Sequence, residues 1–376
     1  AALKSGVIGL RVEQARVELR NLRIEGTPLP SHQPFHAPVL PFITIAHDGG
    51  AGRYEGFPDL CAAANGDLLC VFYSGFKHVP SGPDLRLPHG GKISLVRSGD
   101  RGKTWSAPQT IHDSPADDHD PHITRLSDGR LVVSLCSWPV ENRHRPFLIW
   151  SKDDGRTWGE AQALDMPFVG SEVPQGPIVE MPDGRLLLPT YGEPLKDDPR
   201  TAVVVRISRD GGRTWPWTPQ QVLYSPEKEG QDRNVYEPCL IRLPDHRLLM
   251  LMRQRMFWAE STDGGLTWSP LRAMAVRGDA PNLLLTSKQV LLCGIRYRGD
   301  PKTGYRRGTC VMFSRDFGRT WSEPVLIAPV IGGYTGMVEL PDGRIFVAYY
   351  TEGEGSDIRG AYLNVDRQGI RALPAP

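Results

Sequence analysis

An eight-residue motif recurs five times in this chain, with a period of about 53 residues. Every copy has the pattern Ser-x-Asp-x-Gly-x-Thr-Trp, and the copies begin at Ser98, Ser151, Ser208, Ser261 and Ser314. Self-similarity at a fixed period of this length is typical of propellers and other repeat folds, in which each copy is one supersecondary unit. The repeat therefore limits the chain to an assembly of similar units.

The residue types of the motif explain its local structure. Ser and Asp side chains form hydrogen bonds with the amides of tight turns. Gly supplies the positive φ that such a turn needs, and the Trp ring is large enough to pack between neighbouring sheets. We therefore interpret the motif as a structural hairpin and assign it no catalytic role.

A second hairpin signal, a polar turn between two apolar runs, alternates with the motif. Its copies are centred on Asn65-Gly66, Asp128-Gly129, Asp183-Gly184, Asp245-His246 and Asp342-Gly343, with a degenerate copy at Lys288-Gln289. Two hairpins per unit give about four strands, so the chain is predicted to be all-β, a six-bladed β-propeller of four-stranded antiparallel blades. The blades fall near residues 42–110, 119–167, 174–225, 235–275, 280–330 and 333–365. The 40 glycines and 34 prolines suit such a fold of short strands and tight turns.

Residues 1–40 stand apart from the repeats, and the propeller is expected over 41–376. Apolar residues between Val12 and Ile24 alternate with Arg and Glu, which fits an edge strand or an amphipathic helix equally well. Pro28, Pro30, Pro34 and Pro38 then predict a stiff, extended lead-in. The segment is expected to close the propeller, cover one face, or pack on a second copy in a homo-oligomer.

Composition disfavours several classes of partner. The formal net charge is +1, without a basic stripe, so neither nucleic acid nor an anionic membrane surface is predicted as a partner. No apolar run is long enough to span a bilayer, and no signal peptide is visible at the first residues. The six cysteines occur singly, so we predict no metal site and no cofactor. Cys61 and Cys70 flank one hairpin turn, where two buried free thiols are favoured over a disulfide.

The repeated octapeptide resembles the Asp-box of sialidases and related BNR-repeat proteins, and the resemblance covers residues from about 50 to 355. It implies a glycan substrate and a secreted or periplasmic location, although the sequence leaves a cytoplasmic location open. The family pattern comprises a Tyr nucleophile paired with a Glu, an Asp acid/base, and three arginines that bind the substrate carboxylate. Sialidases are an exception to the two-carboxylate chemistry of most glycosidases.

Two segments resemble the nucleophile pair of this family. Gly333-Tyr334-Thr335 places Tyr334 at the nucleophile position, and Tyr236-Glu237-Pro238 places Glu237 as its base. A phenol with a pKa near 10 needs such a base to act as a nucleophile at neutral pH.

The same resemblance identifies residues for the carboxylate site. Arg253 matches the second family arginine, and Arg306 or Arg307 occupies the place of the third, with Arg307 fitting slightly better. Glu352 matches the acidic residue that steadies the first arginine.

Two positions depart from the family pattern. The Arg-Ile-Pro segment of the first blade is Gly56-Phe57-Pro58 here, so Gly56 replaces the first arginine, with Asp59 close behind as a candidate for substrate contact. Arg53 and Arg86 are the arginines that could compensate. The loop after the first hairpin offers Asp84 as the acid/base, because it is the only carboxylate between Phe76 and Arg97.

The start of the second blade is rich in ionisable residues that the resemblance does not explain. His119, Asp120 and His122 are candidates for substrate contact, for a general base supported by Asp, or for a metal site, against a solvated turn-forming loop. Glu172 and Gln175 open the third blade and are further candidates for contact at the axis. For Trp138 and Tyr191, core packing is favoured over stacking on a sugar.

These features favour a retaining exo-glycosidase of the sialidase type that acts on an acidic sugar at the non-reducing end of glycans. The missing arginine predicts poor cleavage of ordinary α-sialosides. Two other classes stay open: an enzyme of this fold that acts on uronate or rhamnose linkages, as hydrolase or lyase, through His119 or His122, and a non-catalytic carbohydrate-binding propeller.

Overall fold

The computed structural model describes residues 41–49, 52–79, 89–140, 143–165, 168, 170–193, 200–225, 234–253, 255–299, 307–353, 355–366 and 369–374. The expectations for residues 1–40, and for Asp84, Arg86 and Arg306, lie outside these described residues. In the described part, the one helix is the 3₁₀ turn η1 (Pro219–Gln221), so no helix there is long and apolar enough to cross a membrane.

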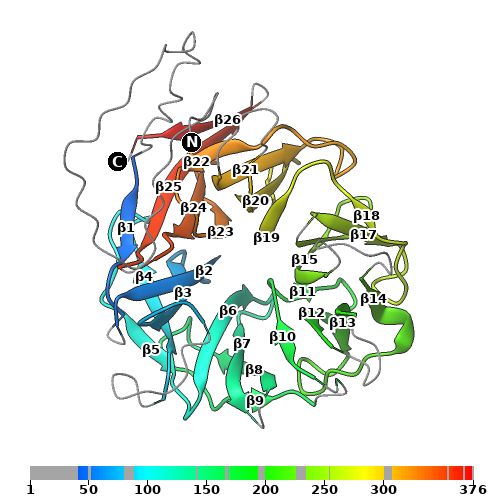
Figure 1. Cartoon of the computed structure of the whole chain (residues 1–376). Helices are drawn as coiled ribbons and strands as arrows, with labels where there is room; N and C mark the ends of the chain where they lie inside the picture. The colour runs from blue at the N-terminus through cyan, green and yellow to red at the C-terminus, as the bar shows by residue number, and fades with distance from the viewer. Residues whose placement is uncertain are drawn as a thin grey trace, which may run out of the picture. The chain divides into compact units, whose positions relative to one another are not determined.

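Six antiparallel sheets surround a common axis, which confirms the predicted six-bladed propeller (Figure 1). The first three blades comprise β2 (Tyr54–Ala62), β3 (Leu68–Gly75), β4 (Lys92–Ser98), β5 (Gln109–His112); β6 (Asp117–Arg125), β7 (Leu131–Val140), β8 (Arg143–Ser151), β9 (Gln162–Ala163); and β10 (Glu172–Pro174), β11 (Val179–Glu180), β12 (Leu186–Gly192), β13 (Ala202–Ser208), β14 (Val222–Tyr224). The next two comprise β15 (Tyr236–Arg242), β16 (Leu248–Arg253), β17 (Phe257–Ser261), β18 (Arg272–Ala273); and β19 (Gly278–Leu285), β20 (Leu291–Tyr297), β21 (Gly308–Ser314), β22 (Val325–Ala328).

The sixth blade joins the two ends of the propeller. It contains β23 (Gly333–Glu339), β24 (Ile345–Tyr350) and β25 (Ile358–Asp366), and the outer edge of β25 pairs with both β1 (Ile43–Ala46) and β26 (Gly369–Leu373). The repeat spacing places residues 43–46 in the first blade, and this boundary is wrong. Pairing with β25 covers part of a sheet edge that would otherwise be exposed.

The motif hairpins connect the third and fourth strands of their blades, and their hydrogen bonds follow the predicted scheme. In the first copy, Asp100 Oδ1 accepts from the Thr104 amide at 2.9 Å, and Ser98 Oγ accepts from the Gly102 amide at 2.8 Å. Hydrogen bonds from Thr104 lower the pKa of Asp100 to about 2. The Trp105 ring lies 5.8 Å from that of Phe346, a residue of the sixth blade, so the motif also joins neighbouring blades.

Both thiols beside the first hairpin are free and buried, as favoured by the sequence. Cys61 lies opposite Leu69, and Cys70 lies opposite Leu60. The two thiols pack into different core clusters because successive residues of a strand point to opposite faces. The side chains therefore diverge, and a disulfide between them is excluded by this register.

A fully buried ion pair fixes the third blade. The Arg206 guanidinium donates to Glu172 Oε1 at 2.6 Å and to Oε2 at 2.5 Å, and it also donates to the carbonyl oxygens of Trp215 and Asp165. Both charged side chains are at most 1% exposed. Glu172, which the sequence offers as an axial contact, is thus committed to the interior of its own blade.

We expect the substitution Arg206→Met to lower the free energy of unfolding by about 3–5 kcal/mol, because it leaves the Glu172 carboxylate buried without its partner. The exposed pair Arg371–Asp366 provides the control, since Arg371→Met should change stability by about 1 kcal/mol or less. Urea unfolding followed by tryptophan fluorescence measures both. Equal losses in the two variants would contradict the role assigned to this pair.

A second prediction concerns Glu55, which is fully buried in the first blade. Its carboxylate accepts from the Gly49 amide at 2.7 Å and from Ser74 Oγ at 2.9 Å, and burial raises its pKa to about 7. Between the ordinary pKa of about 4.5 and this value, the folded state keeps a proton that the unfolded chain releases. Folding stability from this residue therefore falls as the pH rises through that window.

The substitution Glu55→Gln removes this dependence while keeping an acceptor for Gly49. The difference in unfolding free energy between the variant and the unsubstituted chain should therefore shift in favour of the variant by about 2–3 kcal/mol when the pH is raised from about 4 to about 8. Urea unfolding curves at the two pH values measure the shift. A stability difference that does not change with pH would show that Glu55 stays ionised in the folded protein.

Candidate active site

The inner strand of every blade is interrupted by a residue of positive φ. The six residues are Phe57, Asp120, Gly176, Glu237, Ala280 and Tyr334, with φ between 47° and 73°. Five of them precede a proline, which lacks the N–H that a regular ladder would need. Register shifts accompany the residue in five inner strands, and such bulges re-aim side chains.

A cavity of about 320 Å³ lies beside these bulges. The described residues that line it are Phe57, His78, Val79, His119, Asp120, His144, Ser171, Val173, Tyr191, Gly192, Glu193, Tyr236, Glu237, Arg253 and Tyr334. Four of the six bulge residues are among them, drawn from the first, second, fourth and sixth blades. The bulge therefore brings distant parts of the chain to one site.

Another cavity of about 330 Å³ lies between the motif turns of the second and third blades, where Arg130, Trp150 and Arg213 line it. Arg130 donates there to the Gly211 carbonyl oxygen at 3.1 Å and lies over the Trp150 ring. These contacts hold the motif turn of the third blade against the second blade. We place the site in the axial cavity because it gathers the Tyr, Glu and Arg that the sequence singles out.

Tyr334, Glu237 and Arg253 form one connected group at the axis. The Tyr334 hydroxyl donates to Glu237 Oε1, and Arg253 Nη1 lies 2.6 Å from the same oxygen. The second oxygen, Oε2, accepts from the Ala280 amide at 2.8 Å. Burial and the Glu237 charge raise the pKa of Tyr334 well above its ordinary value. The phenol is therefore neutral at rest and already bonded to a base that can remove its proton.

A second arginine, Arg296, approaches Tyr334 from the fifth blade. Its guanidinium lies 5.2 Å from the centre of the Tyr334 ring and donates to the Tyr350 hydroxyl at 2.7 Å. Arg306 or Arg307 is the arginine expected as the third one at the carboxylate site. Arg307 lies exposed beside the start of β21, and Arg306 lies outside the described residues. Arg296, which is not among the predicted residues, lies beside the nucleophile candidate.

The repeat itself contains the signal that identifies Arg296. The second strand of each blade has its sixth residue at the same structural position: Tyr73, Cys136, Tyr191, Arg253, Arg296 and Tyr350. Arg253 and Arg296 are therefore equivalent in successive blades. Alignment of the second hairpins, in addition to the octapeptides, would have found both.

At Gly56, aromatic side chains fill the space that a longer side chain would need. A Cβ atom there would lie 3.1 Å from Tyr54 Cε1 and 3.8 Å from the Tyr350 ring. Glu352 accepts from the Tyr54 hydroxyl at 2.9 Å and from the Tyr350 hydroxyl at 2.8 Å. The carboxylate expected to steady an arginine is thus held by two tyrosines. Arg53 is exposed and does not enter this group.

The network around Glu352 also includes His78, whose Nδ1 lies 3.3 Å from Oε1. Burial acts to raise the pKa of Glu352, but the hydrogen bonds from His78, Tyr350 and Tyr54 outweigh it and lower the pKa to about 2. The carboxylate is therefore ionised over the physiological range, without an arginine from the first blade.

The remaining candidates divide between the cavity and the interior. His119 and Asp120 line the cavity, and so does Tyr191. Asp59 instead accepts from the Ile123 amide at 3.0 Å, and its carboxylate lies 3.5 Å from His122 Nδ1. These contacts join the inner strands of the first two blades.

Gln175 is also buried, and its backbone amide donates to the Pro189 carbonyl oxygen at 3.1 Å. Asp59, His122 and Gln175 are not among the described residues that line the cavity. His78, His144 and Glu193 line it without having been singled out, since they lie outside the octapeptides and the turns of the inner hairpins.

The Tyr54 ring leaves little room for a side chain at position 56. Gly56→Arg should lower the free energy of unfolding by about 1–3 kcal/mol, because the new side chain collides with the Tyr54 ring. Adding Tyr54→Ala removes the collision, so the double variant should lose less than the sum of the two single variants. Chemical unfolding of the four proteins measures this coupling.

The matched control combines Gly56→Arg with Tyr349→Ala. Tyr349 is buried in the sixth blade within a different core cluster, so its effect should add to that of Gly56→Arg. Additivity in the Tyr54 pair as well would show that Tyr54 does not occupy the space beside Gly56.

Comparisons with known proteins agree with this fold. The family model described as "BNR repeat-like domain" matches residues 90–329, more than half of the chain. A sialidase of Bacteroides fragilis is 24% identical over 204 residues, which are 50% of this chain and 36% of that protein. The chain thus matches little more than a third of this curated relative.

Similar solved structures include a protein of unknown function from Dyadobacter fermentans, with a TM-score of 0.69 and 20% identity over 86% of this chain and 96% of that chain. A Hadza microbial sialidase gives a TM-score of 0.67 and 19% identity, covering 85% of this chain and 68% of that chain. Trypanosoma rangeli sialidase gives a TM-score of 0.66 and 13% identity, covering 86% of this chain and 59% of that chain. The family match shows that this chain belongs to the BNR repeat-like family, and the structural comparisons show that it shares its fold with these sialidases.

Proposed function

We propose that this chain is a retaining exo-glycosidase that releases an acidic sugar from the non-reducing end of glycans. The observation that carries the proposal is the hydrogen bond from the Tyr334 hydroxyl to Glu237, within a cavity that also contains Arg253. A nucleophile bonded to a base, which a third group orients, is the arrangement that covalent catalysis requires. The curated relative and several structural neighbours are named sialidases, which supports the same reaction class.

The reaction begins with proton transfer from Tyr334 to Glu237. The phenolate oxygen then forms a bond to the anomeric carbon while the bond to the leaving oxygen breaks. A nucleophile that stays neutral until this proton transfer suits an acidic sugar, because a permanently charged carboxylate nucleophile would repel the carboxylate of the substrate as it binds. Water then releases the sugar from Tyr334 with overall retention of configuration, and the tyrosine recovers its proton.

The leaving group needs a proton, and we assign its donation to Asp84. Val79, which precedes Asp84 by five residues, lines the cavity, and this proximity along the chain supports the assignment. Asp84 then returns as the base that activates water in the second step. Asp120, whose side chain lines the cavity, is assigned to substrate contact together with His119.

The substrate carboxylate is assigned to Arg253 and Arg296. Arg253 shares Glu237 with Tyr334, and Arg296 lies against Tyr334 and Tyr350, so both cations stand beside the reacting oxygen. The first blade contributes Gly56 and the Tyr54 ring instead of a third arginine. Loss of one charge-assisted bond weakens transition-state binding by about 1.5–3 kcal/mol.

Steady-state turnover of aryl glycosides tests the proposal. The panel contains an α-sialoside, α- and β-glycuronides and neutral sugars, assayed with the unsubstituted chain, Tyr334→Phe, and the control Tyr349→Phe. We expect turnover of an acidic sugar that Tyr334→Phe abolishes and Tyr349→Phe preserves. Turnover of the α-sialoside should be at least about tenfold below that of the preferred glycoside. Proton NMR of the first-formed product should show the retained anomer.

Other outcomes identify the alternatives. Efficient turnover of the α-sialoside would contradict the specificity assigned from Gly56, and turnover by Tyr334→Phe would contradict the nucleophile. An unsaturated product would indicate a lyase that acts through His119, the second candidate, which the position of His119 and Asp120 in the same cavity favours. Glycan binding without turnover of any substrate would indicate a non-catalytic propeller.

A secreted or periplasmic location, where glycans are available, fits the proposed reaction.

A further inference from the structure

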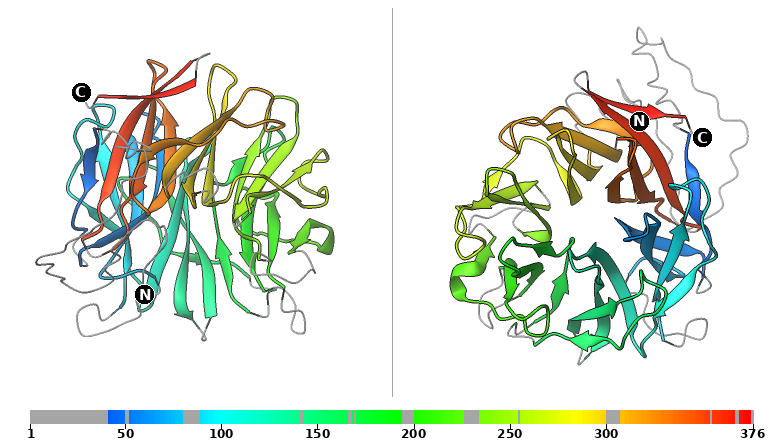
Figure 2. Two further views of the ribbon diagram at one scale, coloured as in Figure 1. Left: turned by 45° about the horizontal axis from the view of Figure 1, so that its top comes forward. Right: turned by 180° about the vertical axis from the view of Figure 1, so that it is seen from behind.

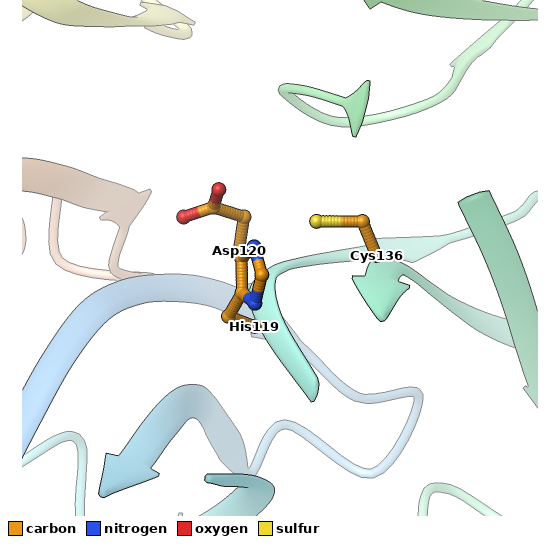
Figure 3. A group of neighbouring side chains, drawn as sticks. All are labelled: His119, Asp120 and Cys136. Atoms are coloured by element: carbon orange, nitrogen blue, oxygen red, sulfur yellow. The ribbon is translucent and has the colours of Figure 1, made fainter. Parts of the chain in front are cut away.

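The second blade places three metal-ligating side chains of different chemistry within reach of one ion. The imidazole of His119, the carboxylate of Asp120 and the thiol of Cys136 each offer an atom, and these atoms lie within 4.8 Å of one another. All three residues are buried. Figure 3 shows the Cys136 sulfur pointing toward His119 and Asp120 across the sheet.

The bulge in β6 explains how two successive residues can share one ion. In a regular strand, neighbouring side chains point to opposite faces of the sheet. Asp120 has a φ of 51°, and the register shifts between His119 and His122, so the alternation is broken there. His119 is directly opposite Cys136 in the pairing of β6 with β7. The spacing of the cysteines predicts no metal site, although His119 and Asp120 are candidates for one by residue type. The bulge supplies the proximity to Cys136 that spacing along the chain does not reveal.

The hydrogen bonding of His119 leaves the correct nitrogen available. Its Nδ1 lies 3.1 Å from the Asp117 carbonyl oxygen, which can only accept, so Nδ1 carries the proton. The Nε2 atom then keeps a lone pair that can accept from a thiol or bind a metal ion, and the His119 side chain already forms a hydrogen bond with Cys136. Metal-ligating histidines almost always donate their other ring N–H to a carbonyl or carboxylate in this manner. Asp117 is itself held in place, since its Oδ1 accepts from the Gly91 amide at 2.6 Å and from Tyr73 at 3.0 Å.

Access to the group comes from the axial cavity. His119 and Asp120 line that cavity, whereas Cys136 lies at the equivalent strand position to Arg253 and Arg296 in other blades. The Asp120 carboxylate forms no hydrogen bond or ion pair within the part of the chain that the structure describes. A zinc ion with three protein ligands and a fourth position open to a cavity can also bind water or a substrate atom.

We propose that His119 Nε2, an Asp120 carboxylate oxygen and the Cys136 thiolate bind a divalent transition-metal ion, with Zn²⁺ the best match. Zn²⁺ accepts nitrogen, oxygen and thiolate ligands together, whereas Ca²⁺ and Mg²⁺ require oxygen ligands. Binding releases the thiol proton to solvent, so the metal replaces a proton and no oxidation occurs.

The ion would also change the charge of the cavity. Among the described lining residues, the carboxylates Asp120, Glu193 and Glu237 outnumber the one arginine, Arg253. A dication beside Asp120 offsets this excess and presents an open position to an oxygen of the substrate. This last consequence rests on the proposed acidic-sugar substrate, whereas the metal site itself does not.

Cobalt binding tests the site directly, without substrate. The full chain is reduced, freed of metal with a chelator, and titrated with Co²⁺ under absorbance detection. We expect one Co²⁺ per chain, a thiolate-to-cobalt charge-transfer band in the near ultraviolet, and displacement of the band by Zn²⁺. Cys136→Ala should abolish the band, and Asp120→Asn and His119→Gln should each weaken Zn²⁺ binding at least about tenfold.

Cys293→Ala is the matched control, because Cys293 is a fully buried free thiol in the second strand of the fifth blade. It should leave the cobalt spectrum unchanged. A charge-transfer band that survives in Cys136→Ala, or no band in the unsubstituted chain, overturns the proposal. If Cys136→Ala does not fold, Asp120→Asn decides, and unchanged Zn²⁺ affinity in that variant overturns it as well.

Binding of Zn²⁺ and turnover of glycosides are measured separately, so that failure of one proposal can be told from failure of the other. A chain that binds the ion but cleaves no glycoside supports the metal site and contradicts the proposed function. A chain that cleaves a glycoside at full rate without any cobalt spectrum contradicts only the metal site.

Discussion

The left-handed residue in each inner strand is the constraint on which the site depends. A regular strand would direct alternate side chains into the two faces of its blade, where the cores of neighbouring blades leave no room for a ligand. The break in alternation lets the side chain of the bulge residue line the axial cavity in four of the six blades. Glu237 and Tyr334 meet in this way although 97 residues separate them. The proline that usually follows the bulge avoids an unsatisfied N–H at the break in the ladder.

The strands of each blade run between the two ends of the propeller (Figure 2). In the antiparallel order of the strands, the motif turns and the inner hairpin turns lie at the same end, where side-chain hydrogen bonds and Trp contacts join neighbouring blades. The ends of the second strands lie toward the other, and there the same six positions hold Tyr, Cys and Arg in different blades. The hairpin turns are alike in every blade, whereas the residues at these six positions differ from blade to blade.

The sequence predicts the blades well because their signals are local. Turn residues and a Trp within eight positions define each motif hairpin, and a polar turn between apolar runs defines each inner hairpin. The pair Tyr334 and Glu237 is also visible in short segments around each residue. Arg296 is not among the predicted residues because the family resemblance places the third arginine at Arg306 or Arg307, although the position of Arg253 within its own hairpin points to Arg296. The Tyr54 ring beside Gly56, and the approach of Cys136 to His119, arise from packing between strands, which no spacing along the chain reveals.

The pairing of β1 with β25 has a consequence for how the protein is made. Thr44 lies opposite Arg359, so two strands about 315 residues apart complete one sheet. On a ribosome, β1 emerges before the six blades and waits for its partner until β25 has been made. During that time the first five blades can form, but the ring stays open between the first and the fifth blade. A nascent chain of this kind is most exposed to association with its neighbours before β25 emerges, and the pairing of β1 with β25 closes the ring.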